Sequence, residues 1–285
     1  MTLNVGKIEA LEIAPVEHRY DVRDTILYAL GLGYGSDPVD PAQLQFVYEQ
    51  GLKTVPSFSC VLAHPGFWLQ QPEYGADWVK ILHAEQAFEM HAPLPTSVAV
   101  RGEYSIAGLE DKGADKGALM HQIKTIYDQS DNRKLATVRS TLFLRGDGGQ
   151  GGFGARIAPP APLPDRAPDR VFDVSTTPQQ ALIYRLSGDL NPLHADPGTA
   201  RRAGFPAPIL HGLCTNGLAC RALISAYCDD QPDRLASMFV RFSSPTMPGE
   251  TIRMEFFEEA DGLRFRARSL ERDIVVLDRA SATVI

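Results

Sequence analysis

Hydrophobic and polar residues alternate at strand spacing through much of the C-terminal part of the chain. The alternating segments are 234–243, 251–258, 263–271 and 274–285. Asp261-Gly262 marks a hairpin between the second and the third of them. Apolar residues recur at helical spacing over 212–227 and, more briefly, over 179–184. This part is therefore predicted to hold one main helix and an antiparallel sheet.

The N-terminal part repeats this order of elements. A helix is predicted over 23–32, where apolar residues recur at helical spacing, and a second apolar segment over 57–69 is interrupted by Pro65. Strand-like segments follow at 96–106, 118–129 and 134–144. The pattern predicts an α+β protein of two units, each an antiparallel sheet around one central helix.

A change of composition separates the two parts. Residues 146–154 are mostly glycine and residues 159–168 are rich in proline, and a flexible stretch followed by a stiff one is typical of a linker. We therefore predict an N-terminal unit at 1–145, a linker at 146–170 and a C-terminal unit at 171–285.

The glycines at the start of this linker resemble a nucleotide-binding loop. Gly146, Gly148 and Gly151 match the spacing G-x-G-x-x-G. That loop acts only between a strand and a helix, and here prolines follow instead of a helix. The dinucleotide interpretation is therefore rejected.

Composition excludes several classes of partner. The chain is 44% hydrophobic and 22% charged with a net charge of −7, which argues against nucleic acid and anionic membranes as partners. No apolar run approaches the about 20 residues of a membrane span, and the N-terminus has no apolar signal segment. Four cysteines without paired spacing suggest free thiols in a reducing compartment, so we expect a cytoplasmic protein.

Acid, amide and imidazole groups gather in one short segment. Asp189, Asn191 and His194 lie within six residues. Pro192 and Pro197 are expected to interrupt any helix, so the segment is predicted to be a loop on which these side chains converge.

The helix predicted from Gly212 follows shortly after this loop. A helix N-terminus favours an anion, so a carboxylate and an imidazole facing it would form an acid/base pair aimed at an anion site. The backbone N–H of Gly212 is the candidate donor to a carbonyl oxygen. His211 is expected to be structural.

The sequence gives less support for a metal site or a serine hydrolase. His194 and Asp196 are close in sequence, but no further ligands follow at a metal-binding spacing, so no metal is expected. No G-x-S-x-G is present for a serine hydrolase. Judged locally, Glu49 is a solvated surface carboxylate near a helix end.

Several segments in the same order together resemble one enzyme family. They are 23–31, 46–49, 82–86, 111–113, 184–197, 208–214 and 241–242. The chain resembles the (R)-specific 2-enoyl-CoA hydratases of the MaoC-like hydratase 2 type, including the hydratase domain of the peroxisomal multifunctional enzymes type 2. The resemblance covers nearly the whole chain and implies a double hot dog fold, in which two sheet-around-helix units form a pseudo-dimer.

The resemblance also implies roles for individual residues. Asp189 and His194 would be the catalytic dyad, supported by Asn191, and Gly212 would bind the thioester oxygen through its N–H. Glu49 falls on a carboxylate that the family needs for activity. The positions implied to contact coenzyme A or the acyl group are His83, Ala84, Lys112, Tyr184 and Phe242.

The N-terminal unit and two positions depart from the full pattern. The N-terminal unit lacks Asp-x-Asn-Pro-x-His, and in the family this unit shapes space for bulky acyl chains. Ala84 replaces a usual glycine, and Leu190 replaces a common aromatic residue.

The implied reaction is hydration of a trans-2-enoyl-CoA to the (R)-3-hydroxyacyl-CoA, with coenzyme A as part of the substrate and no separate cofactor. A homodimer is also plausible. Two alternatives stay open: a hot-dog acyl-CoA thioesterase, and a non-catalytic acyl-CoA-binding protein. Lys112 fits either a phosphate contact or a solvated charged loop.

Overall fold

All the strands belong to one antiparallel sheet in the computed structural model, which describes residues 2–285. Along the sheet the strand order is β1-β3-β4-β5-β2-β8-β11-β10-β9-β7, and β6 pairs with β3 outside this path. The strands of the N-terminal half are β1 (Val16–Tyr20), β2 (Ile81–Met90), β3 (Val98–Asp111), β4 (Ala118–Asp128), β5 (Lys134–Leu144) and β6 (Phe153–Gly154). Those of the C-terminal half are β7 (Arg170–Ser175), β8 (Leu235–Phe242), β9 (Thr251–Glu259), β10 (Gly262–Ser269) and β11 (Ile274–Val284).

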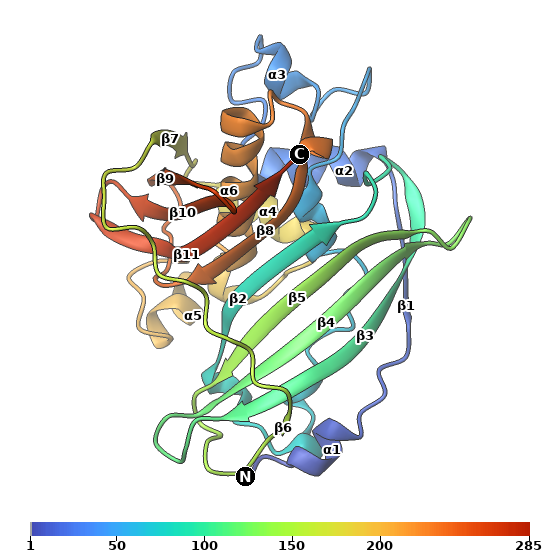
Figure 1. Cartoon of the computed structure of the whole chain (residues 1–285), viewed down its shortest axis with the longest axis vertical. Helices are drawn as coiled ribbons and strands as arrows, with labels where there is room; N and C mark the ends of the chain where they lie inside the picture. Colours follow the sequence, from blue (N-terminus) through green and yellow to red (C-terminus); the bar gives the residue numbers. More distant parts are fainter. Residues whose placement is uncertain (1) are drawn as a thin grey trace.

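The strand order is the same when it is traced inward from either end of the sheet. In each half the first strand lies at the edge, the third, fourth and fifth follow, and the second lies at the centre. The halves meet where β2 pairs antiparallel with β8, for example Gln86 with Val240 and Phe88 with Met238 (Figure 1). All four of these side chains are buried, so the junction is part of the core.

The alternation of the sequence explains the strands of the C-terminal half. In β9, Ile252, Met254 and Phe256 are buried while Arg253 and Glu255 between them are half-exposed, as period-two alternation requires. The predictions for β8 to β11 are confirmed to within a few residues at their ends. The predicted hairpin joins β9 to β10, with residues 260–261 as its turn.

The helix α6 (Gly212–Tyr227) occupies the bounds predicted for it. Ten of its residues are buried, which explains why its apolar residues cover more than one face. The other α-helices are α1 (Val5–Glu9), α2 (Val22–Gly31), α3 (Pro41–Leu44), α4 (Gln180–Tyr184) and α5 (Pro197–Arg202). Asp21 and Asp24 form a capping box at the start of α2.

In the N-terminal half, the helix at the centre of the sheet is much shorter than α6. Only the short 3₁₀-helix η1 (Pro56–Cys60) lies against β2, β5 and α6. Pro56 starts it without an N–H to satisfy, and the amine of Lys124 then donates to the carbonyls of Cys60 and Leu62 at 3.0 and 2.6 Å. A side chain from β4 therefore satisfies carbonyls that a longer helix would have bonded within itself.

The two halves share one core. The largest cluster of buried side chains includes Tyr28 and Phe88 from the N-terminal half and Leu223 and Phe256 from the C-terminal half. The segment between the halves crosses the sheet toward β7 (Figure 1). On its way, its Pro160 carbonyl accepts a hydrogen bond from Arg279 of β11 at 3.3 Å.

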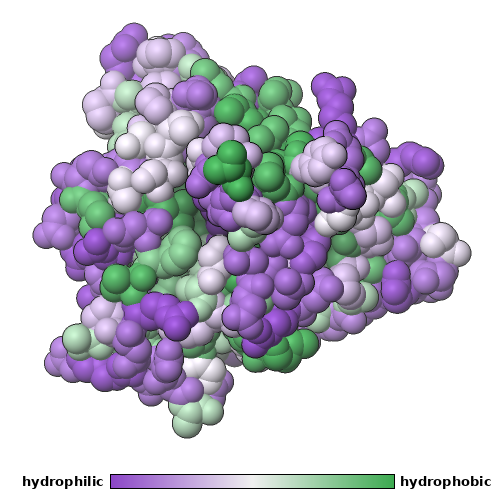
Figure 2. All heavy atoms as spheres, turned by 90° about the horizontal axis from the view of Figure 1, so that it is seen from above, coloured by the Kyte–Doolittle hydropathy of each residue, from purple (hydrophilic) through white to green (hydrophobic). Residues whose placement is uncertain are grey.

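Hydrophobic groups lie among hydrophilic residues on the end of the molecule that carries α3 (Figure 2). Within residues 2–285, no helix is both long enough and apolar enough to cross a membrane.

Candidate active site

A short helix carries the imidazole of His194, whereas Asp189 lies in irregular backbone just before it. The 3₁₀-helix η6 (Pro192–His194) is capped by the Asn191 side chain, which accepts the N–H of Leu193 at 3.0 Å. Pro192 and Pro197 are each the first residue of a helix, where a proline needs no partner for its nitrogen. The prediction of a loop was therefore wrong in part, because each of these prolines starts a helix.

His194 is held as a neutral base. Its side chain is buried, and its Nδ1 lies 2.8 Å from the carbonyl of Ile209. A carbonyl only accepts, so Nδ1 carries the proton and Nε2 keeps a free lone pair. Burial lowers the pKa of His194, which keeps the ring uncharged at neutral pH.

Asp189 lies beside this base. Its side chain is exposed and accepts the backbone N–H of Asn191 at 3.1 Å. One carboxylate oxygen of Asp189 and one ring nitrogen each of His194 and His211 all lie within 4.8 Å of one another. The acid and the imidazole that the sequence singled out are therefore neighbours in space.

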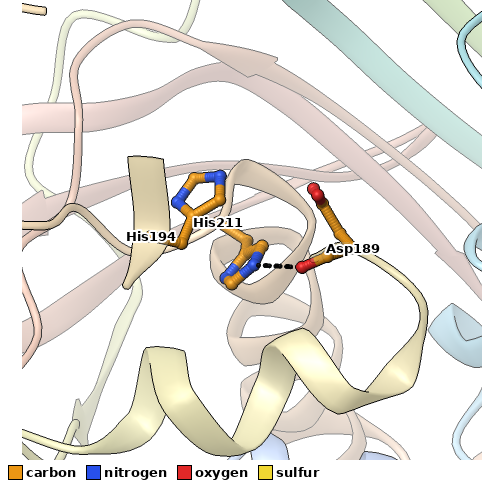
Figure 3. Close-up of side chains that lie close together, drawn as sticks. All are labelled: Asp189, His194 and His211. Atoms are coloured by element: carbon orange, nitrogen blue, oxygen red, sulfur yellow. Dashed lines mark hydrogen bonds between the residues drawn. The ribbon is translucent and has the colours of Figure 1, made fainter. Parts of the chain in front are cut away.

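His211 joins this group, although the sequence suggested only a structural role for it. Its ring stacks on that of His194, with centroids 3.7 Å apart and planes inclined by 26°. Its Nε2 lies 3.1 Å from the backbone carbonyl of Asp189, as the dashed line in Figure 3 shows. Such a cluster could also hold a metal ion, so the expectation of no metal stays a prediction.

Gly212 is the first residue of α6 and is exposed. The first N–H groups of a helix have no partner within it, and the helix dipole adds positive potential there. A Cβ added at Gly212 would meet the ring of Phe242 at 3.4 Å. The helix start and Phe242 therefore lie in contact, with an N–H available at this point.

A second group of predicted contacts lies near the start of β2. The rings of His83 and Phe242 meet edge to face, with centroids 5.0 Å apart, and Nε2 of His83 lies 3.1 Å from the carbonyl of Glu85. Ala84 lies at a shift of register between β2 and β5, so a bulge sets the direction of these side chains. Burial lowers the pKa of His83 to about 4, against a smaller opposing effect of the Asp189 charge.

His64 lies near the same group and was not singled out from the sequence. Its Nδ1 accepts the N–H of Gly66 at 3.0 Å, and its side chain is exposed. Nearby protein atoms displace water from around the ring, and this desolvation lowers the pKa of His64 to about 4. The negative charge of Asp189 raises the pKa by a smaller amount. No local pattern marks this histidine, because it reaches the site only through the fold of the segment after η1.

Tyr184 lies behind the site. It is 1% exposed and packs between Tyr28, with ring centroids 5.8 Å apart, and His211, at 5.1 Å. Its position suits support of His211 better than contact with a substrate.

Lys112 and Glu49 stand apart from this group. The exposed Lys112 pairs with Glu110 at 2.6 Å, and Glu110 also pairs with Arg156. Glu49 lies in an exposed bend beyond α3. Among residues 2–285, no side-chain hydrogen bond or ion pair joins it to Asp189 or His194, so its role stays a prediction.

The glycine-rich loop binds a carboxylate of the chain itself. Asp111 accepts the N–H groups of Gly113, Gly149 and Gly151 at 2.9, 2.8 and 2.7 Å. These bonds, led by that from Gly149, lower the pKa of Asp111. The N–H groups that could have cradled a phosphate are thus used to fasten the loop to β3.

Known proteins resemble both halves of the chain. The MFE-2 hydratase 2 N-terminal domain matches residues 18–146, and the MaoC like domain matches residues 160–279. The peroxisomal enoyl-CoA hydratase 2 of Arabidopsis thaliana is 36% identical over 290 residues, covering 96% of this chain and 93% of that one.

Solved structures agree in fold. A MaoC-like dehydratase from Phytophthora capsici is 35% identical, covers 99% of each chain and superposes with a TM-score of 0.88. A Mycobacterium tuberculosis protein described as a double hot dog fold is 16% identical, with a TM-score of 0.61 over 96% of this chain and 94% of that one, and supports the fold alone. The predicted double hot dog is thereby confirmed, and the chain belongs to the MaoC-like hydratase 2 family of hydro-lyases.

Proposed function

We propose that this enzyme hydrates trans-2-enoyl-CoA reversibly to (R)-3-hydroxyacyl-CoA. The observation that carries the proposal is the free Nε2 of His194 beside the carboxylate of Asp189, next to the start of α6. Membership of the hydratase 2 family supports the same reaction.

The N–H of Gly212 would bind the thioester oxygen. The thioester draws electrons from C3 and makes it electrophilic, and negative charge develops on the oxygen as water adds. A backbone donor at the positive end of α6 stabilises that charge, and losing one such donor costs roughly 3 kcal/mol in known cases.

Asp189 and His194 would hold and activate one water. The water O–H bond breaks as its proton passes to the pair, the oxygen bonds to C3, and the C2=C3 electrons move toward the thioester. The pair then returns a proton to C2, so water is the only reactant added. We treat Asp189 and His194 as one acid/base unit and assign both proton transfers to the pair. Both groups come from one short segment, so water and proton reach the same face, which is syn addition.

The remaining predicted contacts divide into two groups. His83, Ala84 and Phe242 lie together and would contact the acyl group or the pantetheine arm. Lys112 would meet a phosphate of coenzyme A if its pair with Glu110 opens. Coenzyme A enters as part of the substrate, and the reaction needs no separate cofactor.

The first test is a spectrophotometric assay with crotonyl-CoA and a long-chain trans-2-enoyl-CoA. We expect the enoyl-thioester absorbance to fall, (R)-3-hydroxyacyl-CoA to form and no free thiol to appear. Release of thiol without hydration would instead identify a thioesterase. Binding without either change would identify a non-catalytic acyl-CoA-binding protein.

A cytoplasmic location and a homodimer complete the proposal. The Arabidopsis relative is named as peroxisomal, so imaging of the tagged chain in its own cells is the direct test of location. Sedimentation equilibrium tests the dimer.

A further inference from the structure

We propose that His211 is a positioning residue of the hydration site, which holds the Asp189 backbone by a hydrogen bond and the His194 ring by stacking. The inference rests on the proposed function, because it assigns His211 a role through these two residues. Three observations carry it: the hydrogen bonding of the His211 ring, its contacts with both residues, and its place in the chain.

The bonding of His211 defines its protonation. Nε2 lies 3.1 Å from the carbonyl of Asp189, which can only accept, so Nε2 carries a proton. Nδ1 is buried and has no hydrogen-bond partner among the described residues. A second proton there would be a buried donor without an acceptor, on a charged ring, and both are costly. The ring is therefore neutral.

A neutral ring suits its stacked neighbour. With ring centroids 3.7 Å apart, a charge on His211 would repel a charge on His194. A neutral His211 leaves His194 free to accept a proton during the reaction. Burial, and then the repulsion that a protonated His194 would exert, lower the pKa of His211 to about 4. Asp189 opposes this by raising the pKa, and the positive charge of Arg185 lowers it further.

His211 also links elements that are far apart in the chain. The segment from 188 to 192 is exposed and has few bonds to the rest of the protein. Two hydrogen bonds join the acid/base segment to residues 209–211: His194 to the carbonyl of Ile209, and His211 to that of Asp189. His211 is also the residue before Gly212, so one side chain sets the acid/base pair beside the proposed oxyanion donor.

The direct test is the protonation state of His211 in the wild-type enzyme. Nitrogen NMR of histidine-labelled protein, assigned with a His211→Gln variant, should show a neutral ring with its proton on Nε2 from pH 5.5 to 8.5. A ring protonated at pH 6, or a proton on Nδ1, would overturn the inference without any measurement of activity.

Kinetics test the positioning role. His211→Phe keeps a stackable ring and loses the N–H, and we expect kcat to fall about 30-fold or more with KM changed less than about threefold. His211→Gln restores a donor and should recover part of that loss. In an Asp189→Asn background the effect of His211→Phe should nearly vanish, since there is no longer a working pair to position.

The controls separate this inference from the proposed function. His91→Phe changes a histidine that bonds Thr137, outside the site, and should leave kcat unchanged. If Asp189→Asn is inactive and a folded His211→Phe has wild-type kcat, the inference alone fails. If Asp189→Asn keeps full activity, the dyad fails, and the role of His211 fails with it.

Discussion

At the scale of single residues, the site depends on which nitrogen of each histidine is free. Backbone carbonyls bind Nδ1 of His194 and Nε2 of His211, which leaves the opposite nitrogen of each ring without a proton. The neutral base and its neutral neighbour thus result from two main-chain contacts.

Replacement of Asp189 by Asn tests the dyad. The amide keeps the size of the side chain but cannot accept a proton, so we expect kcat to fall by at least about 100-fold. Because Asp189 is exposed, the thermal midpoint should change little. Steady-state kinetics and thermal unfolding of the same preparation check both points, and near-normal activity would refute the dyad.

Replacement of Gly212 by Pro tests the proposed oxyanion donor. Proline is tolerated at the first position of a helix, and His211 before it has φ −61° and ψ 139°, which a following proline permits. Only the N–H should be lost, and kcat should fall about 100-fold or more.

Gly212→Ala is the matched control, because it adds a Cβ near Phe242 but keeps the N–H. It should retain most of the activity that Gly212→Pro loses. Equal kcat values for the two variants would argue that the N–H plays no part.

The sequence could predict part of this arrangement. Asp189, Asn191, His194 and Gly212 belong to short, recognisable motifs, and the first three are close in the chain. The role of His211 depends on a stacking contact across seventeen residues, which no local pattern encodes.

At the scale of elements, alternation predicted the longer strands and missed four, among them the two-residue β6. β1 and β7 have only five and six residues, and β2 is interrupted by its bulge at Ala84. The shortness of η1 could not be predicted from local pattern either, because Lys124 on β4 satisfies the carbonyls where this helix stops.

Lys124 makes stability depend on pH. Burial lowers its pKa to about 8, below the about 10.4 of an unfolded lysine, so the unfolded chain binds more protons between these values. The cost of burying the charge is fully present below pH 8 and is relieved as the pH rises toward 10.4.

Lys124→Met removes this dependence. We expect the unfolding free energy of wild type relative to Lys124→Met to rise by about 2 kcal/mol between pH 7.5 and 10. Denaturant unfolding at both pH values measures it, and the buried thiols and tyrosines, present in both proteins, serve as the common background. A constant difference would mean that folding does not lower the pKa of Lys124.

At the scale of the whole molecule, the symmetric strand order and the shared core describe two units in one sheet. We propose that the units are 1–145 and 171–285, joined by the linker at 146–170. The division could be predicted from the composition of the sequence. The pairing of β2 with β8 could not, because no local pattern in either strand specifies the strand with which it pairs.

Cleavage of the linker should leave the two halves together. Arg156, whose side chain is 80% exposed, offers trypsin a site. Because the β2–β8 ladder and the common core do not involve the linker, we expect the cut fragments to co-elute in gel filtration with the uncut protein and to separate only in denaturant. Dissociation of the fragments in native buffer would contradict this.

The pairing of two similar but unequal halves in one polypeptide also has a consequence for how such an enzyme can change. In an assembly of identical subunits every substitution occurs in both copies, so a mutation that reshapes one pocket also alters the other. Here a substitution occurs once. The half with η1 can accumulate mutations that recognise new substrates while the half with α6 is kept for chemistry, and directed evolution of this protein can begin by randomising only the first.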